Sequence, residues 1–251
     1  MSLTPEQEWL LVGCGLIAHA DEILDIGEWD AALRLIDETL SGPDQATWQQ
    51  ILADQSALEE RFAELPPLPA ERHEEVLHRC WKMALVDGTG SDVEETVHDR
   101  LARRLGVDED HVAALRERWT GEATARSEIA AGLAAAFANL DGHLAFQEAI
   151  HFDNLLERLP LSMSKRLELA QLLHKPPRLD PLIESLAALA LDDRVAALHM
   201  LVPLIQASDR SDQERALFLE IAARAAVPQG DAERLLRGES GHGLRFQGAM
   251  E

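Results

Sequence analysis

The chain has 251 residues, of which 46% are hydrophobic and 4% aromatic, and its formal net charge is −22. This length provides for two cores of ordinary size, and the excess of Ala and Leu over Val and Ile favours helix over strand. The acidity argues against broad binding to nucleic-acid phosphates or anionic lipid. The negative charge is compatible with binding of a cation or of a basic protein surface, and its simplest role is to keep the protein soluble.

The sequence shows no signal-peptide pattern, and its longest apolar runs fall short of the ~20 residues that span a bilayer. We therefore expect no direct membrane insertion. Two cysteines give no disulfide framework, so a cytoplasmic location is expected. Cys14 and Cys80 each precede an aspartate by seven residues, which predicts two equivalent buried positions in an internal repeat.

Helical patterns follow one another along the chain, separated by turns that contain Gly, Pro or Asp. The first, over 10–20, is apolar almost throughout and is predicted to be buried. The others cover residues 28–40, 47–63, 71–86, 92–105, 109–119, 129–140, 146–158, 163–173, 183–189, 194–206, 212–225 and 231–236. The expected fold class is all-α, with a domain joint at 120–126 and a flexible Gly-rich tail at 238–251.

An aspartate follows a small-apolar helix four times, and a glutamate opens the helix after each. These residues are Asp21, Asp87, Asp141 and Asp209, followed by Glu28, Glu94, Glu148 and Glu214. Asp21 and Asp141 are 120 residues apart, and the same shift places Ala102 on Ala222 and Val107 on Val227. The period predicts two tandem domains, 1–120 and 127–237, each built from two related halves.

These aspartate-glutamate patterns resemble the sequence motif of the tellurite-resistance TerB family, a group of small all-helical bacterial domains. The sequence carries Ala20-Asp21 with Glu28, Val86-Asp87-Gly88 with Glu94, Leu140-Asp141-Gly142 with Glu148, and Ser208-Asp209 with Glu214. The segment Leu-Ala-Arg-Arg-Leu-Gly-Val at 101–107 is also similar to that family. The resemblance covers 1–120 and, more loosely, 127–237. It implies a tellurite or other stress response and no catalytic activity.

Carboxylates that follow a turn aspartate can converge on one side of the turn, which suits a hard divalent cation such as Ca²⁺ or Mg²⁺. The candidate ligands are Asp21, Asp25, Glu28, Asp87, Asp92, Glu94, Asp141, Glu148, Asp209, Asp212 and Glu214. No EF-hand loop is present, so such a site would be irregular. The simpler interpretation is that these acids cap helices and offset the exposed N–H groups of the first turn.

Three functions stay open at this point. The main hypothesis is a non-enzymatic binding or scaffold protein of a bacterial stress response, which recruits a divalent cation or a protein partner with a basic surface. The second is a helical di-metal carboxylate enzyme that uses the Glu-x-x-His pairs Glu95/His98 and Glu148/His151, although such pairs are expected to be solvated neighbours on exposed helix faces. The third is a purely structural adaptor whose acids only cap helices.

Overall fold

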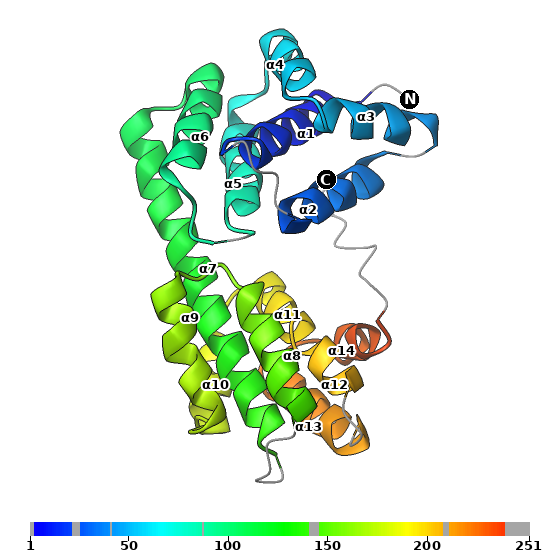
Figure 1. Ribbon diagram of the computed structural model, residues 1–251, viewed down its shortest axis with the longest axis vertical. Coiled ribbons are helices and arrows are strands. Elements are labelled where there is room, and N and C mark those ends of the chain that lie inside the picture. Colours follow the sequence, from blue (N-terminus) through cyan, green and yellow to red (C-terminus); the bar gives the residue numbers. More distant parts are fainter. Residues whose placement is uncertain are drawn as a thin grey trace, which may run out of the picture. The chain divides into compact units, whose positions relative to one another are not determined.

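The computed structural model describes residues 3–21, 26–40, 42–86, 88–140, 146–207 and 211–238, and its regular elements in these ranges are all helices (Figure 1). This confirms the all-α fold class. The first unit contains α1 Pro5–Ala18, α2 Ile26–Thr39, α3 Pro43–Leu52, α4 Gln55–Glu64, η1 Ala70–Arg72, α5 His73–Ala84 and α6 Asp92–Leu105. The helix α7 Glu109–Ala138 follows. After it come α8 Phe146–Glu157, α9 Met163–Ala170, η2 Gln171–Leu173, α10 Leu179–Ala188, α11 Leu191–His199, α12 Val202–Ala207, α13 Ser211–Arg224 and α14 Gln229–Leu236.

The chain divides into two compact units, Met1–Ala123 with Arg158–Pro160, and Thr124–Glu157 with Leu161–Glu251. The division falls inside α7, which corrects the prediction that one helix ends at 119 and another begins at 129. Gly121 is the only helix breaker in the expected joint, and one glycine in a helix interior costs only about 1 kcal/mol. Burial of Trp119 in the first unit and of Ser127 in the second anchors the helix on both sides of this glycine.

Two other predicted helices are each divided in the structure. The segment 47–63 breaks before α4, because the Asp54 side chain accepts hydrogen bonds from the backbone N–H groups of Ser56 and Ala57, at 2.9 and 3.4 Å. A short polar side chain of this kind favours an N-cap over a helix interior. The segment 194–206 breaks between α11 and α12, where Pro203 lacks the N–H group that a continuous helix would use. No described helix is long and apolar enough to cross a membrane.

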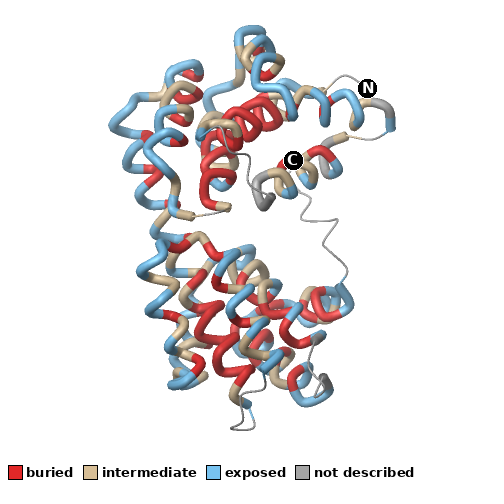
Figure 2. The backbone as a smooth tube through the Cα atoms, in the orientation of Figure 1, coloured by how far each residue is buried: buried red, intermediate tan, exposed pale blue. Residues whose placement is uncertain are grey.

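Helix α1 forms the centre of the first unit and is buried from Trp9 to Ala18, which confirms the predicted buried helix (Figure 2). A Cβ atom added at Gly13 would lie 2.6 Å from Cys80 Sγ, so this glycine lets α1 and α5 pack closely. Both cysteines are buried, as predicted, and they are not joined by a disulfide bond. A hydrogen bond with Cys14 and burial hold the pKa of the Cys80 thiol well above its usual range, so the pair serves packing.

The helix ends after α6 and α13 match at an offset of 120 residues. Gly106 adopts the left-handed conformation with φ 75°, and Ala226 does so with φ 54°. Val107 N–H donates to the Ala102 carbonyl at 2.9 Å, and Val227 N–H donates to the Ala222 carbonyl at 2.8 Å. Both ends therefore share one capping geometry. The match agrees with the predicted offset, while the complete tandem-repeat architecture stays a prediction.

Candidate functional site

The acidic residues predicted as ligands have different environments. Asp25, Asp87, Asp141 and Asp209 lie outside the described residues, as does the side chain of Glu28. Asp21, Asp92 and Asp212 are exposed, Glu148 is half-buried in the first turn of α8, and Glu94 and Glu214 are buried. Within the described ranges, no three His, Cys, Asp or Glu side chains are grouped to hold a metal ion. The cation site thus stays a prediction.

Glu94 caps helix α6 together with Ser91. The Ser91 hydroxyl accepts a hydrogen bond from the Glu94 backbone N–H at 3.3 Å, and Glu94 Oε2 accepts one from the Ser91 N–H at 2.7 Å. This reciprocal arrangement is a capping box, which satisfies two N–H groups that lack partners in the helix. For Glu94, the predicted capping role is confirmed. Its neighbours Asp92 and Glu95 are exposed.

His98 is fully buried, which corrects the expectation that the Glu-x-x-His pairs lie on exposed helix faces. Its Nε2 lies 2.9 Å from the Leu77 carbonyl, and its Nδ1 lies 3.4 Å from Arg116 Nη1. A carbonyl only accepts and a guanidinium only donates, so the proton sits on Nε2. Burial lowers the pKa of His98 to about 4 and keeps the ring neutral. Neither nitrogen is open to a metal ion in this arrangement.

Arg116 on α7 connects the three helices around this histidine. Its guanidinium forms an ion pair with Asp99, lies 4.0 Å from Glu95 Oε2, and sits 5.6 Å from the centre of the Trp81 ring. Trp81 Nε1 in turn donates to Thr120 Oγ1 at 3.0 Å. The side chain of Arg116 is only 10% exposed. A buried guanidinium needs such compensation, because removing one partner leaves a buried charge unpaired.

A hollow of about 330 Å³ lies over this guanidinium, and we call it the Arg116 hollow. Its lining comes from α5, the turn after it, α6 and α7: Trp81, Thr89, Glu95, Ala113, Arg116, Glu117 and Thr120. The carboxylates of Glu95 and Glu117 outnumber the one guanidinium, Asp99 pairs with that guanidinium and adds a further negative charge, and His98 adds none. The hollow therefore carries a net negative charge and suits a cation.

The polar groups around Arg116 are replaced at the positions 120 residues further on. There the buried places of His98 and Arg116 are taken by Phe218 and Leu236, which are also buried. The rim positions Glu95 and Glu117 become Arg215 and Arg237. The helices α13 and α14 thus form with an apolar centre and a basic rim, so this part of the fold does not require the acidic hollow.

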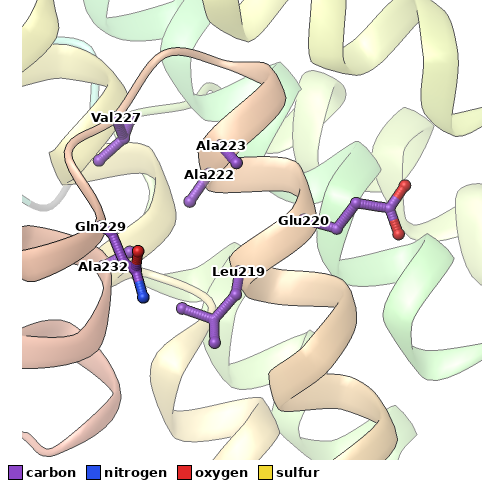
Figure 3. Close-up of a pocket in the computed structure, with 7 residues that line it drawn as sticks. All are labelled: Leu219, Glu220, Ala222, Ala223, Val227, Gln229 and Ala232. Carbon is purple, nitrogen blue, oxygen red and sulfur yellow. The ribbon is translucent and has the colours of Figure 1, made fainter.

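The second unit has an apolar hollow of about 320 Å³ between α13 and α14 (Figure 3). It is lined by Leu219, Glu220, Ala222, Ala223, Val227, Gln229 and Ala232. At the matching positions of the first unit, Arg103 Nη2 and Glu109 Oε1 form an ion pair at 2.7 Å. Ala223 and Gln229 cannot form that pair, and the short Ala223 side chain leaves the space open.

No family model, curated protein or solved structure matches this chain. The candidate site is therefore argued from geometry. Sequence patterns did not reveal the Arg116 hollow, because Trp81, Glu95 and Arg116 lie on three helices and share no local motif. Glu95 and His98 stand out in the sequence by their spacing alone, and a comparison with Arg215 and Phe218 at the 120-residue offset is the signal that singles them out.

Proposed function

We propose that this chain is a non-enzymatic, TerB-like binding protein of a bacterial stress response, and that it recruits a positively charged partner through the Arg116 hollow. The observation that carries this proposal is the excess of carboxylate over guanidinium in the lining of the hollow. Asp99 already pairs with Arg116. Glu95, which lies 4.0 Å from Arg116 Nη2 with its side chain 50% exposed, and the exposed Glu117 also line the hollow and are accessible to a ligand.

Charge on the whole chain supports the same partner class. With a net charge of −22, the protein attracts cations over distances of about one Debye length, roughly 8 Å at physiological salt. Binding is favoured over catalysis because both ring nitrogens of His98, next to the hollow, already have partners within the protein. Nε2 faces the Leu77 carbonyl and Nδ1 faces Arg116 Nη1. His98 offers no base to a bound molecule.

Titration of the full chain with a short basic peptide tests this function, with intrinsic tryptophan fluorescence as the signal. The double variant Glu95→Gln with Glu117→Gln should weaken binding about tenfold, the size expected for loss of about 1.4 kcal/mol. Glu64→Gln with Glu71→Gln is the matched control, since both residues are exposed in the first unit, outside the hollow, and the change in net charge is the same.

The two double variants separate the hollow from the general charge of the surface. The proposal is supported if the control binds within about twofold of the wild type, a difference of roughly 0.4 kcal/mol. Equal weakening in both variants would assign the binding to diffuse charge and reject the site. Preference for an acidic peptide over a basic one would reject the partner class.

A further inference from the structure

We infer that the Arg116 hollow receives an alkylammonium group, the chemistry of a lysine side chain or a free polyamine. This inference rests on the proposed function and narrows its ligand class. It excludes a guanidinium and a divalent metal ion as the preferred occupant. Three properties of the hollow carry it: the distribution of its acceptors, the occupied face of Trp81, and its apolar floor.

The acceptors of the hollow come from separate elements. Glu95 is on α6, Glu117 and Thr120 are on α7, and Thr89 is in the turn before α6. An ammonium is a compact point charge with three donors on a flexible stem, so it can bond to acceptors in several directions. A guanidinium is a planar fork that gains most from one carboxylate held in its plane. The dispersed acceptors therefore favour the ammonium.

The aromatic face of Trp81 is already used within the protein. The Arg116 guanidinium lies 5.6 Å from its ring centre, and the ring is 1% exposed. Stacking on an aromatic face is a main advantage of an incoming guanidinium over an ammonium. Because Arg116 takes this place, an arginine side chain from a partner would lose that contact and would also meet a second guanidinium.

The floor of the hollow suits methylene groups. Ala113 is a small residue on the exposed side of α7, and it gives the lining its accessible apolar part. The stem of a lysine or polyamine packs on such a surface while its charged end bonds to polar groups. By contrast, Ca²⁺ takes six to eight oxygen ligands. The described residues contain no group of three or more His, Cys, Asp or Glu side chains placed to surround a metal ion, so Ca²⁺ is not the preferred ligand.

A set of peptides of equal length with one variable central residue tests the inference on the chelator-treated full chain. The central residue is lysine, arginine, acetyl-lysine or norleucine, and affinity is measured by tryptophan fluorescence and by calorimetry. We expect the lysine peptide to bind about tenfold more tightly than the acetyl-lysine and norleucine peptides, and several-fold more tightly than the arginine peptide. Spermidine forms a separate arm: tighter binding of spermidine than of the lysine peptide identifies a free polyamine, and the reverse identifies a protein side chain.

Ala113→Leu provides the variant that blocks the floor without touching a charge. Ala113 is exposed, so the larger side chain should leave the unfolding midpoint unchanged while the lysine preference disappears. Equal affinity for the lysine and arginine peptides overturns this inference and leaves the proposed function standing. Failure of both basic peptides to bind overturns the proposed function itself. Tighter binding of Ca²⁺ than of any amine, lost in the Glu95→Gln with Glu117→Gln variant, also overturns the inference.

Discussion

Replacement of His98 by Phe should remove most of the pH dependence of stability of the first unit between neutral and mildly acidic pH. The ordinary pKa of histidine is 6.5, and burial lowers that of His98 to about 4. Between these values the unfolded chain binds a proton that the folded chain does not. The stability contributed by the neutral ring is therefore fully present above pH 6.5 and is lost as the pH falls toward 4.

The size of this effect follows from the two pKa values. At about 1.4 kcal/mol per pH unit, His98 should account for a loss of about 2 kcal/mol in the free energy of unfolding between about pH 7.5 and about pH 5. An aromatic ring is compatible with the position, since Phe218 is buried at the matching place of the second unit. His98→Phe shifts stability at every pH because it removes hydrogen bonds, so the informative quantity is the difference between the two pH values.

Urea unfolding followed by tryptophan fluorescence measures this difference, because all five tryptophans precede residue 120 and report the first unit. The control is His111→Gln, an exposed histidine on α7, which should keep the wild-type pH dependence. The same pH dependence in the wild type and in His98→Phe would refute the reasoning. So would an NMR titration in which His98 changes protonation near pH 6.5.

Four further substitutions follow from local geometry and are measured by chemical or thermal unfolding. Gly15→Ala should destabilise the protein by about 1–3 kcal/mol, because the new Cβ would lie 2.6 Å from a methyl carbon of Leu52. Gly121→Ala should stabilise it by about 0.5–1 kcal/mol, because the space around Gly121 is open. The opposite order of the two effects would contradict this packing. Ala226→Gly should stabilise the second unit by about 1 kcal/mol, since φ is 54° there, and a loss of stability would count against that conformation. Ser91→Ala should cost about 1 kcal/mol through loss of the capping box, and no change in unfolding would argue that the cap is dispensable.

The sequence by itself determined the helical class and several helix ends. The excess of Ala and Leu, with few β-branched residues, predicts helix because these side chains lose little freedom there. Ser91 with Glu94 and the glycine at 106 form their caps within a few residues of chain, so a local pattern was sufficient to locate them. The burial of α1 could also be predicted from the sequence, because its residues are apolar on all sides of the helix.

Only the tertiary structure decided how α7 and the Arg116 hollow are built. Local signals at 120–126 indicated a joint, but burial of side chains on both sides of Gly121 outweighs the weak helix preference of one glycine. His98 was expected to be a solvated neighbour of Glu95 on an exposed helix face. It is buried because Leu77 on α5 and Arg116 on α7 supply hydrogen-bond partners from distant parts of the chain, and such non-local partners leave no periodic pattern in the sequence.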